Sequence, residues 1–493
     1  MNAASAEPPF VLALDIGTSS VRTIVFDRLG QPAGAQAQVA YEMRTTPDGG
    51  VEIDADHLIG IVGQTLDALY DQAYPSLSHV IGVAVSTFWH NLIGVDADGR
   101  AVTPLISWAD TRPEAAVPRL RERLDEAATH ARTGCVLHAS YLPAKLLWLA
   151  RAHPAAFRQA ARWMSIGEYL FQRFFGRSVC SLSMASGTGL FNQHTCTWDR
   201  ETIQALPIDP DQLSPLTDLQ TPVAGLVDEF ARRWPALRDV PWWPAVGDGA
   251  CSNIGSGCVS SDRIALMVGT SGAMRVLWPT ETFTIPHGLW CYRADRRRVV
   301  MGGALSNGGN VYEWMRDTLR LRSPDEVERD LAAIEPDTHG LTVLPFWAGE
   351  RSPGWHGSAR ATLTGLSLHT TPLHILRAGL EATAYCFAFI HRIIQTVRPE
   401  ARTIIASGGG LLHSPVWMRM MADVLGQPVT ASAVPEASSR GAALLALEAA
   451  GVLTDLTEAP VPLGMPYAPD PERHERYRAA MERQQRLYDV LIG

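Results

Sequence analysis

Short apolar runs that end at glycine alternate along this chain with longer amphipathic segments. The first apolar run covers residues 10–17, and a second, rich in β-branched residues, covers residues 18–27 on the other side of a Gly-Thr-Ser corner. Such a pair of runs predicts a β-hairpin with a tight turn. The same pattern returns at residues 263–272 and 273–278. The chain is therefore expected to contain two similar hairpins.

The two Gly-Thr-Ser corners begin at Gly17 and Gly269, about half a chain length apart. A repeat at this spacing predicts two related α/β domains, each opening with a hairpin whose turn faces the other domain. A boundary near Asn253 gives one domain at residues 1–253 and another at residues 254–493. The length of 493 residues agrees with more than one domain.

Strand and helix patterns alternate in the rest of the chain. Residues 79–87 and 401–410 have the apolar character of buried strands, and residues 91–102 predict a hairpin around Asp98 and Gly99. Helices are expected where apolar residues recur at helical spacing. These segments are residues 113–128 (interrupted by Pro118), 141–154, 161–176, 370–397 and 414–426, and the charged tail after Pro466.

Composition excludes several classes of protein. The net charge of −9 disfavours binding to nucleic acid or to anionic membranes, because both depend on basic surface. Seven cysteines without a C-x-x-C pair argue against a disulfide framework and a zinc ribbon. Residues 1–10 show no secretory signal, and no run of about 18 uninterrupted apolar residues is present. We therefore expect a cytoplasmic protein.

The two glycine turns have the composition of phosphate-binding loops. The first contains Asp15, Thr18 and Ser19, and the second contains Gly269, Thr270 and Gly272. Glycine lets the backbone approach a ligand, successive N–H groups form an anion nest, and an aspartate can hold phosphate-bound Mg²⁺. Each turn alone also fits an ordinary hairpin. Their occurrence as a repeat favours phosphate contacts from both domains.

Two further glycine-rich segments are candidates for ligand binding or catalysis. Gly408, Gly409 and Gly410 follow a predicted strand and could let a flat base or a ribose approach closely, or could simply form a loop that needs positive φ. Asp248 lies between two glycines after an apolar segment. It could cap a helix, or it could be a general base that takes the proton of a hydroxyl attacking a γ-phosphate.

Aromatic and polar residues in the first half have the composition of a polyol site. They follow predicted strands, where loops commonly bind ligands. They are Trp89, His90, Trp108, Asp110 and Arg112. Aromatic rings can cover the C–H faces of a polyol while polar groups meet its hydroxyls, although each residue singly is more often a packed core residue. Motifs of P-loop ATPases, zinc proteases and α/β-hydrolases are missing.

Together, these motifs resemble the FGGY family of carbohydrate kinases. They occur in the family's order over nearly the whole chain, and include LALDIGTSSVRTIVFD (12–27), WADTR (108–112), GDGA (247–250), GTSGA (269–273), PFWAGERSPGW (345–355) and SGGGLLHSPVWMRMMADVLG (407–426). The resemblance implies an α/β fold of two actin/hexokinase-like (ribonuclease H-like) ATPase domains with a nucleotide cleft between them. A homodimer is an expectation at the level of the family.

The resemblance also implies roles for single residues. Asp248 would be the general base, and Asp15 would lie near Mg²⁺. A sugar or sugar acid would bind on the first domain. The residues expected to hold ATP are Thr18, Ser19, Gly269, Thr270, Gly272, Gly408, Gly409 and Gly410.

The substrate is expected to be D-gluconate, because the motif at residues 108–112 resembles the Trp-Ala-Asp-Asn-Arg of gluconokinases. Gluconate is an anion, so a cation should meet its carboxylate, and Arg112 and Lys145 are the candidates. Thr111 and Trp89 depart from the gluconokinase pattern, which leaves a pentulose kinase such as xylulokinase open. A non-catalytic actin-fold sugar sensor is an alternative of a different class, disfavoured by the complete set of motifs.

Overall fold

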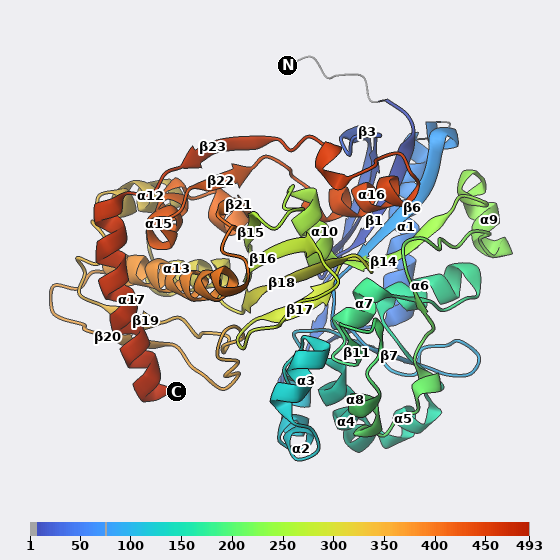
Figure 1. Cartoon of the computed structure of the whole chain (residues 1–493), viewed down its shortest axis with the longest axis horizontal. Helices are drawn as coiled ribbons and strands as arrows, with labels where there is room; N and C mark the ends of the chain where they lie inside the picture. Colours follow the sequence, from blue (N-terminus) through green and yellow to red (C-terminus); the bar gives the residue numbers. More distant parts are fainter. Residues whose placement is uncertain (1–6, 74–75, 493) are drawn as a thin grey trace.

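Two β-sheets with the same internal order organise the protein (Figure 1). The computed structural model describes residues 7–73 and 76–492, so the first six residues of the segment searched for a secretory signal lie outside it. The first sheet has the order β3-β2-β1-β6-β14, formed by β3 (Pro32–Ala40), β2 (Ser20–Phe26), β1 (Phe10–Ile16), β6 (Val80–Thr87) and β14 (Trp242–Gly247). The second contains β18 (Arg298–Leu305), β16 (Gly272–Pro279), β15 (Arg263–Val268), β21 (Thr403–Ser407) and β22 (Val429–Ser432), flanked by β17 (Trp290–Arg293) and β23 (Leu463–Tyr467).

The strand directions repeat along with the order. In each half the opening hairpin and the third strand are antiparallel, and the two strands that follow are parallel to the first. Ile16 pairs with Val21 at the end of the first hairpin, and Val268 pairs with Gly272 at the end of the second. This confirms the predicted α/β fold of two actin/hexokinase-like ATPase domains.

Two helices join the sheets. α10 (Asp248–Gly255) leaves the first sheet, and α16 (Ala437–Ala449), from far along the chain, packs against it and against β1 and β6. The two helices approach so closely that a Cβ atom at Gly255 or at Gly441 would overlap the backbone of the other helix. Leu444 and its neighbours on α16 belong to the hydrophobic core of the first half. A helix from the second half of the chain therefore packs in the hydrophobic core of the first half.

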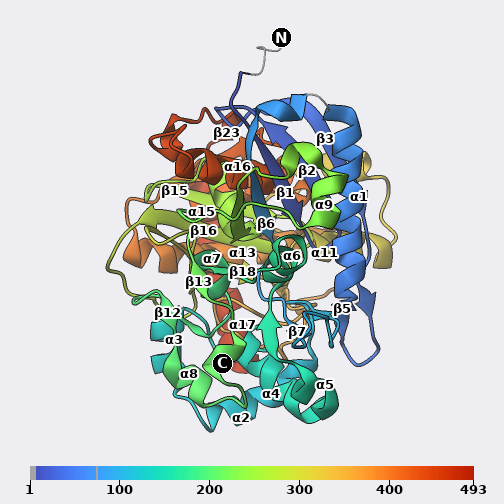
Figure 2. The same cartoon turned by 90° about the vertical axis from the view of Figure 1, so that its right-hand side faces the viewer.

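Figure 2 shows α1 (Ala55–Ala73) beside the first sheet and a separate lobe of short helices below it. The lobe departs from the predicted elements. Residues 113–128 do not form one helix, because Pro118 interrupts them, and the 3-10 helix η2 (Arg112–Ala116) is followed by the short helix α2 (Val117–Arg121). A new helix, α3 (Glu126–Thr133), then begins, and the side chain of Asp125 caps it.

The predicted helix at 161–176 begins late. β9 (Arg162–Met164) comes first, and α6 (Ile166–Phe175) follows a capping box of Ser165 and Glu168. The predicted turn around Asp98 and Gly99 forms, closed by hydrogen bonds from the N–H of Asp96 to the carbonyl oxygen of Arg100 and from the N–H of Val102 to that of Gly94. The regular strand pairing of β7 (Ile93–Val95), however, is with β9, and an isolated bridge joins Val95 to Ala101.

The remaining predicted helices are confirmed as α4 (Leu142–Ala152), α13 (Pro372–Val397), α15 (Pro415–Leu425) and α17 (Pro471–Leu491). By length and composition alone α13 could cross a membrane, but 78% of its most apolar window is buried inside the protein. It is the central helix of the second core, where Leu380, Phe387 and Ile390 pack.

Candidate active site

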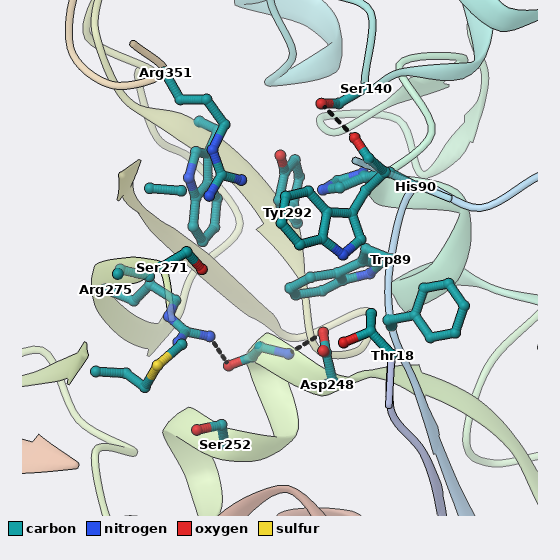
Figure 3. Close-up of a pocket in the computed structure, with 18 of the residues that line it drawn as sticks. Thr18, Trp89, His90, Ser140, Asp248, Ser252, Ser271, Arg275, Tyr292 and Arg351 are labelled. Carbon is teal, nitrogen blue, oxygen red and sulfur yellow. Dashed lines mark hydrogen bonds between the residues drawn. The ribbon is translucent and has the colours of Figure 1, made fainter. Parts of the chain in front are cut away.

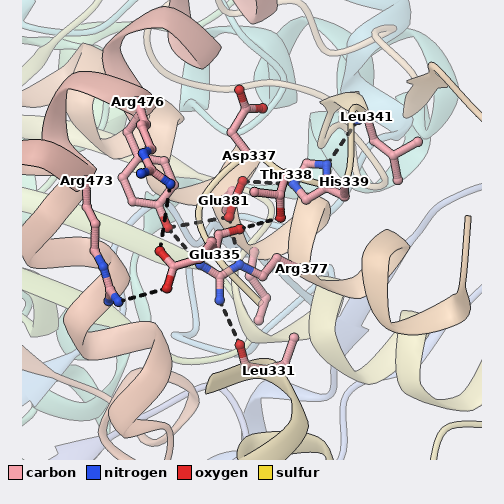
Figure 4. A network of polar contacts seen from close by, with 12 residues as sticks. Leu331, Glu335, Asp337, Thr338, His339, Leu341, Arg377, Glu381, Arg473 and Arg476 are labelled. Carbon is pink, nitrogen blue, oxygen red and sulfur yellow. Dashed lines mark hydrogen bonds and ion pairs between the residues drawn. The ribbon is translucent and has the colours of Figure 1, made fainter. Parts of the chain in front are cut away.

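A cavity of about 370 Å³ lies between the two halves, with Asp248 in its wall (Figure 3). Both domains contribute to its lining. The first half contributes Thr18, Trp89, His90, Trp108, Ser140 and Tyr141, and the second half contributes Ser271, Gly272, Arg275, Trp290, Tyr292, Arg351 and Trp355. The structure therefore brings the first phosphate turn, the second phosphate turn and the predicted polyol residues 89, 90 and 108 to one site.

Asp248 is placed by the junction of a strand and a helix. β14 ends at Gly247, and Asp248 is the first residue of α10, where its Oδ1 accepts a hydrogen bond of 2.7 Å from the N–H of Gly249. A Cβ atom at Gly247 would overlap the indole of Trp89, and one at Gly249 would lie 2.6 Å from that ring and 2.5 Å from Arg275. The flanking glycines thus let Trp89 and Arg275 close on either side of the carboxylate.

The electrostatic environment of Asp248 suits proton transfer. Burial raises its pKa to about 6, while Arg275 and the N–H groups of Gly249 and Trp89 favour the ionised form. A general base works best when its pKa lies near the working pH. Asp248 can therefore be mostly ionised at neutral pH and still accept a proton.

Asp15 has the environment of a cation ligand. It is 3% exposed, its Oδ1 has no hydrogen-bond partner among the described residues, and its ion pair with Arg22 is 3.6 Å long. Burial raises its pKa to about 6, and the negative charge of Asp248 acts in the same direction. A hard divalent cation prefers carboxylate oxygens of this kind. The donor set fits Mg²⁺.

His90 presents an acceptor to the cavity. Its backbone has a φ of 60°, uncommon outside glycine and typical of functional sites. Burial lowers its pKa to about 3, so the ring is neutral at pH 7. Nδ1 bonds to the carbonyl oxygen of Gly187 and must carry the proton, which leaves Nε2 free to accept a hydrogen bond from a substrate hydroxyl.

Aromatic side chains from both domains meet beside His90. Tyr141 and Tyr292, one from each half, share a hydrogen bond of 2.6 Å between their hydroxyls. Trp290 stacks on Tyr292 with ring centroids 4.4 Å apart, and Trp89 meets Tyr292 edge to face. These rings form an apolar wall suited to the C–H faces of a polyol.

Two predicted substrate residues lie elsewhere. Asp110 and Arg112 do not line the cavity, because the Arg112 guanidinium is held by Asp110 and by Glu52, each at 2.6 Å. Lys145 is fully buried and donates to the backbone carbonyl of His90, so it supports that loop from behind. Neither cation suggested by the sequence faces the cavity.

Two cations that the sequence did not single out do line the cavity. Arg275, 4% exposed, donates from Nη1 to the carbonyl oxygen of Gly249 at 2.7 Å, and its Nε has no partner among the described residues. Arg351 comes from the loop after β19 (Thr342–Leu344), and its guanidinium lies 5.1 Å over the ring of Trp108. A charged residue in the otherwise apolar segment AMRVLW was the one available signal for Arg275.

A second cavity, of about 480 Å³, lies behind the second phosphate turn. Gly269, Thr270, Gly409 and Gly410 line it, together with Tyr312, Leu380, His413 and Trp417. β15 and β21 pair in parallel, with Met267 opposite Ser407, which brings the Gly-Thr-Ser turn and the three glycines together. Thr18 and Gly272 line the first cavity instead, and Ser19 is exposed on the first turn and lines neither cavity.

The residues predicted from the sequence also did not include the glycine pair 308–309. Gly309 begins α11 (Gly309–Thr318), and its N–H donates to the carbonyl oxygen of Gly269 at 2.7 Å. The start of this helix therefore faces the second phosphate turn, where its dipole favours an anion.

Gly408 offers a direct test of the tight turn behind this cavity. Its φ is +89°, and an added Cβ would overlap the carbonyl oxygen of Val268. Gly408→Ala should lose about 2–4 kcal/mol of unfolding free energy, from backbone strain and overpacking together, and should weaken ADP binding. Gly34→Ala is the matched control, since its φ is +94° with nothing within 4 Å. If the two variants lose the same free energy of unfolding in urea denaturation, the tight contact of Gly408 with Val268 is contradicted.

The fold and the paired phosphate turns define an ATP-dependent phosphotransferase of two related domains. Residues 10–255 match the N-terminal domain of the FGGY family of carbohydrate kinases, and residues 264–450 match its C-terminal domain. The chain belongs to this family and is an ATP-dependent carbohydrate kinase.

Individual relatives are named for different substrates. The gluconokinase of Bacillus subtilis (strain 168) is 27% identical over 485 residues, which cover 96% of this chain and 94% of the relative. The structure is also similar to a xylulose kinase and a gluconate kinase from Lactobacillus acidophilus, with TM-scores of 0.92 and 0.90. Each is 26% identical, and each match covers 98% of both chains.

Proposed function

We propose that this kinase transfers the γ-phosphate of ATP to a hydroxyl of a sugar acid, D-gluconate, with Asp248 as the general base. The observation that carries the proposal is the charge of the cavity of about 370 Å³ beside Asp248, named here the acceptor cavity. Among the described residues that line it, Arg275 and Arg351 are cations and Asp248 is the one carboxylate. His90 is neutral, because burial holds its pKa at about 3. A cavity with an excess of buried positive charge suits an anionic acceptor.

In this proposal the two substrates bind on opposite sides of the second phosphate turn, one in each cavity. The nucleotide lies against Gly409 and Gly410, and its terminal phosphate reaches the acceptor cavity between Thr18 and Ser271. Asp15, whose Oδ1 has no partner among the described residues, would hold Mg²⁺, which neutralises phosphate charge when bound. The acceptor hydroxyl lies at Asp248, and the apolar wall of Trp290 and Tyr292 excludes water from it.

In the reaction, Asp248 takes the proton of the hydroxyl as its oxygen attacks the γ-phosphorus. Arg275, beside Asp248, is positioned to stabilise the negative charge on the transferring phosphoryl group. Since residues of both domains surround the acceptor, closure of the domains is part of assembling the site.

A panel of acceptors tests the proposal. D-Gluconate, D-xylulose, L-ribulose and glycerol are compared at fixed ATP and Mg²⁺ by release of ADP. We expect D-gluconate to give the highest kcat/KM. A higher value for D-xylulose would instead support a pentulose kinase, the alternative that the aromatic wall and the neutral His90 also accommodate. Release of ADP with none of the acceptors would support the sugar sensor. The domain boundary, the homodimer and the cytoplasmic location stay predictions.

A further inference from the structure

The loop of residues 350–355, named here the acceptor strap, holds two buried donors that have no partner in the described part of the chain. Arg351 donates from Nη2 to the carbonyl oxygen of Leu305 at 2.9 Å, but its Nε is buried and has no partner among the described residues. The indole Nε1 of Trp355 is buried and lacks a partner in the same way. Both side chains line the acceptor cavity. Buried N–H groups are normally paired, so two orphans in one loop point to a ligand that accepts from both.

The backbone of the strap is held in a demanding conformation. Trp355 has a φ of 61°, and its N–H donates to the carbonyl oxygen of Arg351 at 2.6 Å. Strain of this kind persists where surrounding structure fixes it, and it concentrates at ligand clamps. The turn brings the two side chains back to the same cavity.

The rest of the strap is fixed to the second domain. Ser352 exchanges two hydrogen bonds with Ala304 of β18, of 3.0 and 3.1 Å. Glu350 is buried and accepts from the hydroxyl of Tyr488 on α17 at 2.8 Å and from the N–H of Gly354 at 3.2 Å. The orphan donors are therefore presented by a rigid loop, which reduces the entropy lost on binding.

The strap lies away from the reacting end of the cavity. Arg275 is the cation whose charge acts on Asp248, whereas the charge of Arg351 acts on His90, His138 and the two tyrosines of the aromatic wall. Figure 3 shows Arg351 and Asp248 at different ends of the pocket. In an extended sugar acid, the terminal hydroxyl and the carboxylate are likewise at opposite ends.

We propose that Arg351 and Trp355 form the subsite for the carboxylate of the acceptor, with one oxygen accepting from Arg351 Nε and the other from Trp355 Nε1. This assignment rests on the proposed function as a sugar-acid kinase. Burial lowers the pKa of the Arg351 guanidinium, and a bound carboxylate would relieve that cost. Stacking on Trp108 fixes the plane of the guanidinium for such a pairing.

The test compares D-gluconate with D-gluconamide, which has the same shape without the charge. The full chain should prefer D-gluconate in kcat/KM by about 10- to 100-fold, the range of a hydrogen-bonded charge pair. Arg351→Gln should bring this ratio close to one, mainly by raising KM for D-gluconate. Trp355→Phe, which removes only the N–H, should lower the ratio several-fold.

Two controls separate the subsite from general damage. Arg360→Gln removes a guanidinium that, among the described residues, bonds only backbone carbonyls close to the strap, at 2.8 and 3.3 Å, and should leave the ratio unchanged. Arg275→Gln should slow both acceptors and keep the ratio. If a thermal melt shows that Arg351→Gln is not folded, the kinetics of Trp355→Phe alone test the carboxylate subsite.

The failures of the two proposals differ. If the unmodified protein shows no preference for D-gluconate over D-gluconamide, the proposal that it is a sugar-acid kinase is wrong. A clear preference that survives in Arg351→Gln, or in Trp355→Phe if that variant decides, overturns the carboxylate subsite and leaves the proposed function standing.

Discussion

Asp248→Asn is expected to lower kcat/KM for D-gluconate by about 10²- to 10⁴-fold, the contribution of a positioned general base. Asparagine keeps the size of the side chain but cannot take the proton of the attacking hydroxyl. ATP lies mainly against the second phosphate turn and the three glycines, so its binding, measured by titration calorimetry, should persist. A kcat close to that of the natural chain would show that Asp248 is not the general base.

The same substitution should make the ligand-free protein more stable at pH 7. The pKa of Asp248 is raised from 3.8 to about 6, so the folded state binds its proton more tightly than the unfolded state does. Stability therefore falls as pH rises from about 4 to about 6, and at pH 7 the ionised group costs on the order of 2–3 kcal/mol. Asparagine carries no charge and removes this cost.

Thermal melts at pH 7 and at pH 4 check this expectation. The melting temperature of Asp248→Asn should exceed that of the natural chain at pH 7, and the difference should shrink at pH 4. Asp228→Asn is the matched control, because Asp228 is also the first residue of a helix, α9 (Asp228–Arg233), and lies outside the cavity. A variant that loses both activity and stability would mean that Asp248 is needed for the fold.

Arg275→Gln is expected to lower kcat by about 10²- to 10³-fold, which is the usual effect of removing one preorganised group that stabilises a transition state. Arg275 is buried beside Asp248, its Nε has no partner within residues 7–73 and 76–492, and it faces the site where both phosphate turns meet. KM for D-gluconate should change less than kcat, since the charge that Arg275 meets develops on the phosphoryl group. Steady-state kinetics at saturating ATP measure both.

Arg263→Gln is the matched control for Arg275→Gln. Arg263 lies on the neighbouring strand β15 and also donates to a backbone carbonyl, that of Gly257 just after α10, at 3.0 Å, but it does not line the cavity. Its replacement should leave kcat unchanged. A large rise in KM with kcat intact in Arg275→Gln would instead assign Arg275 to ground-state binding of the acceptor.

The features that the sequence predicted well are those whose neighbours in the chain are also their neighbours in space. Each phosphate turn is closed by its own hairpin, and Asp248 is placed by the strand and helix on either side of it. The half-chain repeat of these motifs was enough to predict two related sheets. Turn chemistry and hydrophobic period are local properties, and here they agree with the fold.

The cations of the site could not be predicted in this way, because tertiary contacts decide which charges are free. Arg112 lies next to Trp108 and Asp110 in the sequence, yet Asp110 and Glu52 neutralise it. Arg275 and Arg351 reach the cavity from the second domain, through pairing of β16 with β18 and through the acceptor strap. No local pattern indicates that a buried guanidinium will line a cavity instead of pairing with a carboxylate.

One competition experiment tests the central claim most directly. The chain is given equimolar D-gluconate and D-xylulose with ATP and Mg²⁺, and the two phosphorylated products are counted by mass spectrometry while little substrate has been consumed. Their ratio equals the ratio of the two kcat/KM values. The positively charged acceptor cavity predicts an excess of phosphorylated D-gluconate. An excess of phosphorylated D-xylulose would contradict the assignment of this enzyme as a sugar-acid kinase.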